Sequence, residues 1–367
     1  MRHVSKNGNE TTKAIVDGDW GGDEFQLASV ALANQVDLLG ATTTFGNVSQ
    51  PMVFENAARI MHFLKADEVR LFEGAMAPSD RDRPLLGDGA HPVIEFLPEA
   101  SRDVKEKQDS VEFILEALDR LPPGSVFITA SGPLTNIARA LRQDRHTMMK
   151  VGRVIIMGGC TADMPARDIP VRRGNITPHA EFNFQQAASD ARTVMESNLH
   201  ITLLPMNCTH QLTLTPARHR ELRDAFKGNE LVLRALLGTK PVQNEKVKPH
   251  EADPLDLGLL NAPARLDMGK FGIDPVMHDV NCALYMLHPE QYKVVHGRVA
   301  VEVHDGEVND ENMWGLKQGR AEFVRDDNSH LEVATGIKDS DALFKIVEES
   351  LKALLQQRSE TDAEMWG

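Results

Sequence analysis

Cysteine is scarce in this chain of 367 residues, and its distribution excludes two common ways of stabilising a fold. The three cysteines, Cys160, Cys208 and Cys282, lie far apart in apolar surroundings. An odd and scattered set makes neither a disulfide framework nor a zinc-binding pattern, so we expect reduced residues in the core. No hydrophobic run approaches the length of a membrane span, and the polar N-terminal extension 1–12 does not form a signal peptide. These features indicate a cytoplasmic protein.

The chain also lacks an excess of positive charge. Lys and Arg total 40 against 54 for Asp and Glu, which gives a formal net charge of −14. An acidic surface disfavours binding to the backbone of nucleic acids or to an anionic membrane, so we expect no partner of either kind. Ordinary soluble enzymes share this charge balance, and it therefore selects no particular substrate.

Apolar segments of strand length alternate with segments of helical periodicity in the N-terminal half. We expect strands near 13–17, 36–44, 69–73, 125–130, 153–157 and 199–206, and helices near 23–34, 51–65, 109–120, 134–143 and 185–197. Strands that alternate with helices form a parallel sheet. The sequence therefore predicts an α/β protein with an open, mainly parallel, Rossmann-like sheet and helices on both faces.

The C-terminal part has a different pattern. From residue 293 short alternating strands follow one another, and an amphipathic helix is expected near 341–357. We expect these strands to form a small C-terminal β addition to a single domain, 13–357, with residues 358–367 as a frayed tail. Lys, Pro and Glu are frequent in residues 238–254, which we expect to form a flap.

The segment KAIVDGDWGGDEF places Asp17, Asp19, Asp23 and Glu24 directly after the first predicted strand. Loops at the carboxyl ends of parallel strands line the binding crevice of open α/β sheets. Carboxylates crowded into one loop raise one another's pKa unless positive charge lies among them, and hard divalent cations prefer such oxygen ligands. An Asp-Gly turn is the alternative interpretation, but the density of acids favours a metal site.

Further motifs follow this loop in a fixed order. They are TTTFGNV, ITASGPLTNIARAL, IIMGGC, GNITPHAEFNF and DPVMHDVNCALYML. Together with VDGDWGGDE, this series resembles the inosine-uridine-type nucleoside hydrolases, from residue 14 to about residue 287. The resemblance implies hydrolysis of the N-glycosidic bond of ribonucleosides to ribose and free base. It also implies a nucleoside as the small-molecule substrate and assembly as a homodimer or homotetramer.

The resemblance implies one calcium ion per subunit. Its ligands would be the side chains of Asp19, Glu24 and Asp279 and the backbone carbonyl of Ser131, with Asp17 close behind. Oxygen-only ligation suits calcium, and a bound cation makes a neighbouring water more acidic. Asp19 is then the candidate general base.

The remaining motifs imply a sugar pocket and a proton donor. The residues expected to contact the ribose or its surroundings are Asp23, Asn47, Met157, Asn175, Glu181 and Asn183. Fixed carboxylates and amide oxygens would stabilise the positive charge that develops on the sugar. His278 is expected to protonate the departing base, because a histidine titrates near neutral pH. Turn capping is the alternative role for Asn175 and Asn183.

Three features depart from the family pattern. Glu24 stands where relatives carry a second Asp, and Trp20 replaces a Pro, so that with two glycines after it we expect a freer loop. The predicted flap has no aromatic residue, and no segment matches the base-contacting region of relatives. Base preference and the role of His210 therefore stay open.

Two other functions compete with nucleoside hydrolysis. Asp17 and Asp19 have the spacing of the nucleophile and the general acid in a haloacid-dehalogenase-type phosphatase. Trp20 and the two glycines after it do not fit the pattern of that family. The other alternative is a non-catalytic calcium-dependent binder of ribose or nucleosides, because sequence fixes ligands better than rates.

Overall fold

The computed structural model describes residues 11–82, 84, 97–100, 108–164, 172–229, 232–233, 274–308, 312 and 316–366. The predicted flap 238–254 and all but the last two residues of the N-terminal extension 1–12 lie outside the described residues.

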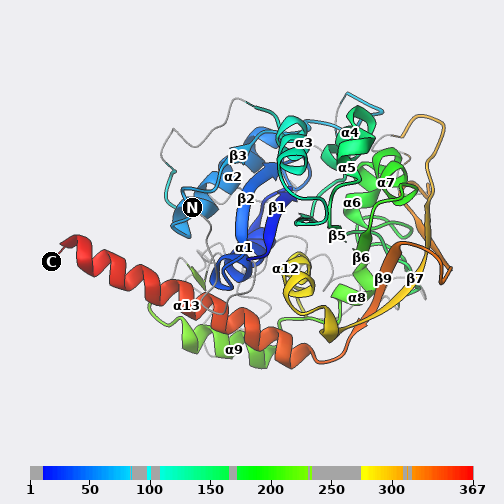
Figure 1. The fold of residues 1–367 in the computed structure, drawn as a ribbon. Coiled ribbons are helices and arrows are strands. Elements are labelled where there is room, and N and C mark those ends of the chain that lie inside the picture. Colours follow the sequence, from blue (N-terminus) through cyan, green and yellow to red (C-terminus); the bar gives the residue numbers. More distant parts are fainter. Residues whose placement is uncertain are drawn as a thin grey trace.

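A nine-stranded sheet forms the centre of the described part, with the order β3-β2-β1-β4-β5-β6-β9-β7-β8 (Figure 1). The strands are β1 (Lys13–Gly18), β2 (Asp37–Thr43), β3 (Leu71–Phe72), β4 (Val126–Ala130), β5 (Arg153–Met157), β6 (Ile201–Leu204), β7 (Tyr292–Val301), β8 (Ala321–Arg325) and β9 (Leu331–Ile337). All neighbours from β3 to β9 pair in parallel, whereas β7 is antiparallel to both β9 and β8. The predicted parallel sheet and its C-terminal β addition are confirmed.

Helices cover both faces of this sheet. They are α1 (Gly22–Ala33), α2 (Gln50–Phe63), α3 (Ser110–Arg120), α4 (Thr135–Gln143), α5 (Arg145–Met148), α6 (Phe182–Gln186), α7 (Ala188–Met195), α8 (Met206–Thr209), α9 (Pro216–Ala225), α12 (Val280–Leu287) and α13 (Ser340–Trp366), with the 3₁₀ turn η2 (Pro289–Gln291). Alternation along β1 separates two cores: Ala14 and Val16 pack with α1, α2, α12 and α13, and Ile15 packs with α3, α4 and α7. The prediction of helices on both faces is therefore confirmed.

Three predicted boundaries are wrong, each for a local reason. The helix expected at 185–197 is two helices, because the backbone at Ala187 leaves the helical region (φ −136°, ψ 54°). The strand expected at 199–206 ends at Leu204, since Pro205 caps α8 and has no N–H for the sheet. Helix α13 continues to Trp366, through the expected tail, because no Gly or Pro interrupts it before Gly367.

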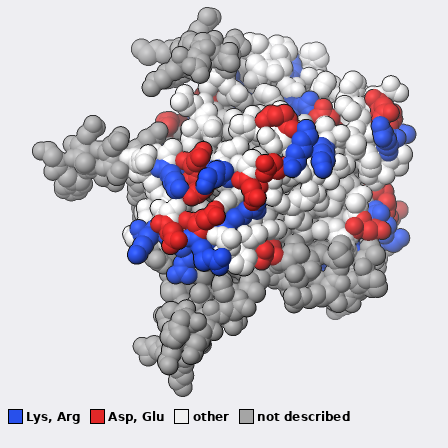
Figure 2. All heavy atoms as spheres, turned by 90° about the horizontal axis from the view of Figure 1, so that it is seen from below, with Lys and Arg blue, Asp and Glu red and all other residues white. Residues whose placement is uncertain are grey.

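Charged side chains of both signs lie side by side on the surface of the protein (Figure 2). On the face shown in Figure 2, Lys and Arg side chains are interspersed with Asp and Glu. None of the helices in the described ranges combines the length and the apolarity that crossing a bilayer requires. Cys160, Cys208 and Cys282 are buried free thiols, as expected.

Candidate active site

The Asp-rich loop lies at the point where the strand order reverses, between β1 and β4. Open α/β sheets bind ligands at this switch point, outside the carboxyl ends of the strands. Asp19 is 2 % exposed in the loop after β1, and Glu24 is fully buried in the first turn of α1. Asp279, 6 % exposed, is the residue that caps α12. The positive ends of two helices therefore face this group of acids.

Hydrogen bonds hold the two loop carboxylates that were predicted to bind metal. One oxygen of Glu24 accepts from the backbone N–H of Gly21 (2.6 Å), and the other accepts from the Ser131 hydroxyl (3.2 Å). Asp19 Oδ2 accepts from the backbone N–H of Asn47 (2.8 Å), and the Asn47 side chain donates to the Asp19 carbonyl (3.1 Å). The loops after β1, β2 and β4 are thus joined through these side chains.

Trp20 anchors the loop instead of freeing it. The indole is fully buried, and its Nε1 donates to the carbonyl of Thr42 (3.1 Å). The expectation of a freer loop is therefore wrong, because a large buried ring and its hydrogen bond fix the residue that precedes the two glycines.

Asp17 is fully buried behind this loop. Its Oδ1 accepts from the Thr42 hydroxyl (2.6 Å) and from the Asn136 side-chain amide (2.7 Å). Burial raises the pKa of Asp17 to about 6 in spite of these two bonds, and its Oδ2 is buried without a hydrogen-bond partner. Such an oxygen is costly unless a cation or a polar ligand compensates it.

The acids of the site act on one another electrostatically. Burial and the negative charges of Glu24, Asp23 and Asp19 raise the pKa of Asp279 well above its usual range, and Glu181 adds to this effect. Burial and the charge of Glu24 raise the pKa of Asp19, while burial raises the pKa of Glu24 to about 7. Carboxyl groups from distant parts of the chain are therefore brought together.

The described residues contain no group of three or more His, Cys, Asp or Glu side chains arranged to hold a metal ion. Asp19 and Glu24 each accept a hydrogen bond from a backbone N–H group. The chemistry of the donor set nevertheless fits a hard cation. It consists of oxygen atoms alone, it is crowded with negative charge, and it includes the unpartnered oxygen of Asp17.

The second predicted block adjoins the first. Asn183 donates from Nδ2 to the carbonyls of Ser131 (2.8 Å) and Met157 (3.1 Å), and Met157 is buried. Glu181 caps α6 and accepts from the N–H groups of Asn183 (2.8 Å) and Gly159 (2.7 Å). The Ser131 carbonyl, predicted as a metal ligand, thus has a protein partner.

Asn175 is half-buried, and its Oδ1 accepts from the backbone N–H of Phe182 (3.0 Å). This bond closes the loop between Asn175 and α6. The capping role weighed as an alternative is therefore present at Asn175.

His278 lies next to Asp279 and is 5 % exposed. Its Nδ1 is 2.7 Å from the Thr209 hydroxyl, and the ring of His210 lies 5.4 Å away between centroids. Burial raises the pKa of Glu181, although hydrogen bonds from backbone N–H groups and, to a smaller extent, the positive charge of His278 act to lower it. His210 and Thr209, which the sequence left without a role, thus surround the predicted proton donor.

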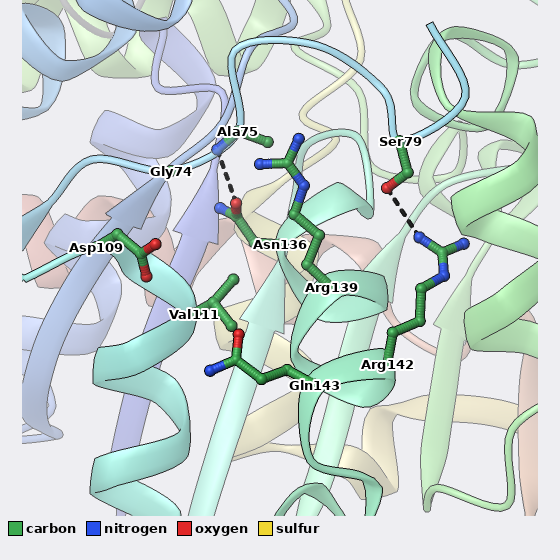
Figure 3. A pocket seen from close by; sticks show the side chains of 9 residues that line it. All are labelled: Gly74, Ala75, Ser79, Asp109, Val111, Asn136, Arg139, Arg142 and Gln143. Carbon is green, nitrogen blue, oxygen red and sulfur yellow. Dashed lines mark hydrogen bonds between the residues drawn. The ribbon is translucent and has the colours of Figure 1, made fainter.

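A cavity of about 450 Å³ lies on the α3 and α4 side of the sheet (Figure 3). Asn136, which donates to Asp17, lines it together with Ala75, Arg139 and Arg142. Neither Asn136 nor Thr42 was predicted from the sequence to be part of the site. The motif GPLTN, which ends in Asn136, was the signal available for the first.

The fold and the site define an α/β protein that gathers buried carboxylates at the switch point of a parallel sheet. The family model of the inosine-uridine preferring nucleoside hydrolases matches residues 14–345, and the chain belongs to this family. Membership confirms the resemblance drawn from the motifs and the expected class of enzyme, a nucleoside hydrolase.

Two relatives and one solved structure show the extent of this similarity. An uncharacterized protein of Schizosaccharomyces pombe is 28 % identical over 334 residues, covering 88 % of this chain and 97 % of its own length. Uridine nucleosidase 1 of Arabidopsis thaliana is 33 % identical over 208 residues, so the match spans 55 % of this chain and 59 % of that protein. The structure of a plant nucleoside hydrolase superposes with a TM-score of 0.71 at 22 % identity, covering 93 % and 99 % of the two chains, which shows the shared fold.

Proposed function

We propose that the protein hydrolyses the N-glycosidic bond of ribonucleosides to ribose and free base, with the help of one bound calcium ion. The observation that carries the proposal is the gathering of buried carboxyl groups from three distant segments, around Asp19, Glu181 and Asp279. A pocket of fixed negative charge stabilises the cationic sugar that forms when this bond breaks.

The proposed calcium ligands are Asp19, Glu24, Asp279 and the carbonyl of Ser131. All are oxygen ligands at the same edge of the sheet. Asp17 lies in β1 directly before the loop, and its Oδ2 is buried without a hydrogen-bond partner. When bound, the cation supplies charge that makes a nearby water more acidic. The carbonyl of Ser131 has a second lone pair beyond the one that Asn183 uses.

Asp19 is the proposed general base. Its Oδ2 accepts a hydrogen bond from the backbone N–H of Asn47 (2.8 Å), which holds the carboxylate in place beside Glu24. A carboxylate held in this way can accept the proton of the attacking water. Asn47 thereby positions the base.

The ribose is proposed to lie between the two blocks. Asp23, Asn175, Glu181 and Asn183 would hold its hydroxyl groups, and Met157 would pack under the ring. Glu181 and Asn183 are both anchored by backbone hydrogen bonds, so they present a fixed polar surface to the sugar. Fixed groups need no reorganisation as charge develops during the reaction.

His278 is proposed to donate a proton to the departing base. Its Nδ1 lies 2.7 Å from the Thr209 hydroxyl, which fixes the orientation of the ring, and an imidazole that titrates near neutral pH suits protonation of a leaving group. The phosphatase interpretation of Asp17 and Asp19 has no remaining support. The family match excludes it, and Asp17 is fully buried beneath the loop, where it cannot act as a nucleophile.

The test is release of reducing sugar from purine and pyrimidine nucleosides, measured with and without a chelator. We expect release that stops when the metal is removed and that Asp19→Ala abolishes. Tight ribose binding without turnover would select the alternative, a non-catalytic calcium-dependent binder. A cytoplasmic location and assembly as a homodimer or homotetramer belong to the same proposal, the first from the free thiols and the second from the family resemblance.

A further inference from the structure

Asn136 occupies a junction below the candidate site. It is the second residue of α4 and is fully buried, five positions after Ser131 in the turn that leaves β4. Its side chain lies between the loop at Ala75 and the body of α4 (Figure 3).

The amide of Asn136 makes three hydrogen bonds, each to a different segment. Its Nδ2 donates to Asp17 Oδ1 (2.7 Å) and to the carbonyl of Thr43 (3.0 Å), and its Oδ1 accepts from the N–H of Ala75 (2.9 Å). The partners belong to β1, to β2 and to the loop that follows β3. With its own place after β4, Asn136 joins the carboxyl ends of four adjacent strands.

Gly74 shows how closely the surroundings fit this amide. A Cβ at position 74 would lie 2.5 Å from both the nitrogen and the oxygen of the Asn136 side chain, and 2.2 Å from the Thr43 carbonyl. A glycine is therefore needed at this position for the amide to reach its partners. The orientation of the amide is fixed as well, since two acceptors face its nitrogen and one donor faces its oxygen.

Asp17 transmits this arrangement to the candidate site. Asn136 and Thr42 both donate to its Oδ1, which fixes the plane of the carboxylate and leaves Oδ2 as its buried oxygen without a partner. The Asp17 carbonyl accepts from the N–H of Ser131 (2.9 Å), so the same residue also holds the turn that carries a proposed calcium ligand.

We propose that Asn136 is a positioning residue for the cation site: by holding Asp17, the end of β2 and the loop after β3 in register, it sets the spacing of the loops that carry the calcium ligands. This inference rests on the proposed function, since it concerns the ion named there. Residues that orient ligands from behind typically change metal affinity by about 10- to 100-fold when they are replaced.

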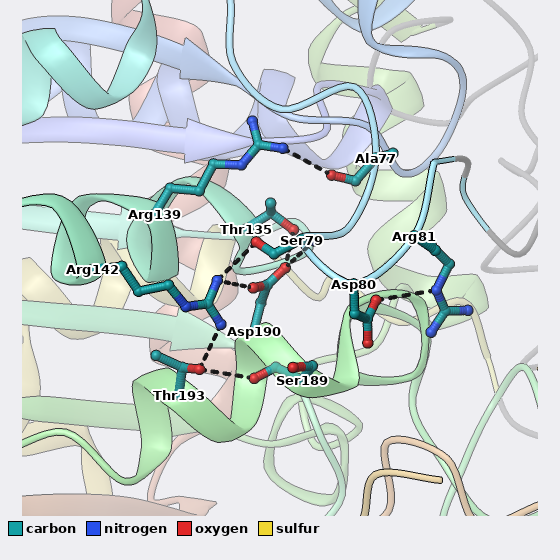
Figure 4. A network of polar contacts seen from close by, with 10 residues as sticks. All are labelled: Ala77, Ser79, Asp80, Arg81, Thr135, Arg139, Arg142, Ser189, Asp190 and Thr193. Carbon is teal, nitrogen blue, oxygen red and sulfur yellow. Dashed lines mark hydrogen bonds and ion pairs between the residues drawn. The ribbon is translucent and has the colours of Figure 1, made fainter. Parts of the chain in front are cut away.

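The experiment compares Asn136→Ala with Thr135→Val. Thr135 is the adjacent residue of α4, is equally buried, and donates to Asp190 Oδ2 of α7 (2.9 Å), which is not one of the proposed site residues (Figure 4). Asn136→Ala removes three buried hydrogen bonds and Thr135→Val removes one, both at the start of the same helix, but only Asn136→Ala removes a hydrogen bond to Asp17. Calcium affinity is measured by titration calorimetry on metal-free protein, and the melting temperature is measured without metal.

We expect both variants to melt below the wild type, and Asn136→Ala alone to bind calcium about 10- to 100-fold more weakly. Equal calcium affinity of Asn136→Ala and the wild type, or equal losses in both variants, would overturn the inference. Should Asn136→Ala fail to fold, Thr42→Val decides in the same way, because it removes the other donor to Asp17. A wild type that binds no calcium would overturn the proposed function and this inference with it, whereas unchanged binding in Asn136→Ala overturns the inference alone.

Discussion

Gly46→Ala gives a sharp test of the geometry around the proposed base. A Cβ at position 46 would lie 2.0 Å from Asp19 Oδ2 and 2.6 Å from both Cβ and Cγ of Asp19. Ordinary contact begins at 3.4 Å, so the oxygen would have to retreat by 3.4 − 2.0 = 1.4 Å. Rotation of the carboxylate does not relieve the overlap, because the carbon atoms of Asp19 also clash.

A displacement of about 1 Å in a catalytic group can cost on the order of 100-fold in rate. We therefore expect Gly46→Ala to lower kcat/KM for nucleoside hydrolysis by at least about 100-fold, while circular dichroism shows a folded protein. Gly124→Ala is the matched control, since no atom lies within 4 Å of its added Cβ. Its positive φ of 82° costs about 1 kcal/mol of stability but leaves kcat/KM unchanged. Wild-type kcat/KM in Gly46→Ala would refute the assignment of Asp19.

Two further predictions concern stability away from the site. Burial alone would raise the pKa of Glu332, but hydrogen bonds from Arg153 and Tyr285 outweigh burial and lower that pKa. The charged form of Glu332 therefore stabilises the fold above about pH 4.3, the ordinary pKa of a glutamate. This contribution disappears as the pH falls through the lowered pKa. Thermal melts should show Glu332→Gln less stable by roughly 1–2 kcal/mol at pH 7, with the difference shrinking in acid; a difference that grows in acid would contradict this. Asp109 caps α3 by accepting a hydrogen bond from the backbone N–H of Glu112 (2.8 Å). Urea unfolding of Asp109→Ala should therefore show a free energy of unfolding about 1 kcal/mol below that of the wild type, with unchanged activity. An unchanged unfolding midpoint would contradict the role of this cap.

The sequence predicted the sheet because its parallel strands are buried on both faces and read as continuous apolar runs. It did not predict the strand order, which depends on pairings such as β6 with β9 between residues more than a hundred positions apart. The break at Ala187 also escaped it, because helical periodicity continues across that residue.

For the site, the carboxylates were recognisable because acids crowded after a strand have few structural roles. The residues that hydrogen-bond Asp17 were not. Thr is a common residue in strands and Asn is a common residue in turns, so neither Thr42 nor Asn136 stands out in the sequence. Their hydrogen bonds to Asp17 form only because β1, β2 and β4 lie side by side. Trp20 was misjudged for a similar reason, since its bond to the Thr42 carbonyl depends on the neighbouring strand.

A crystal structure of the protein with calcium and ribose would show whether the buried carboxylates bind one ion beside the sugar. We expect one ion within about 2.3–2.6 Å of oxygen atoms from Asp19, Glu24, Asp279 and the Ser131 carbonyl, with the sugar hydroxyls facing Glu181 and Asn183. Calcium-soaked crystals in which these three carboxylates point apart, with no ion among them and ribose bound elsewhere, would contradict it.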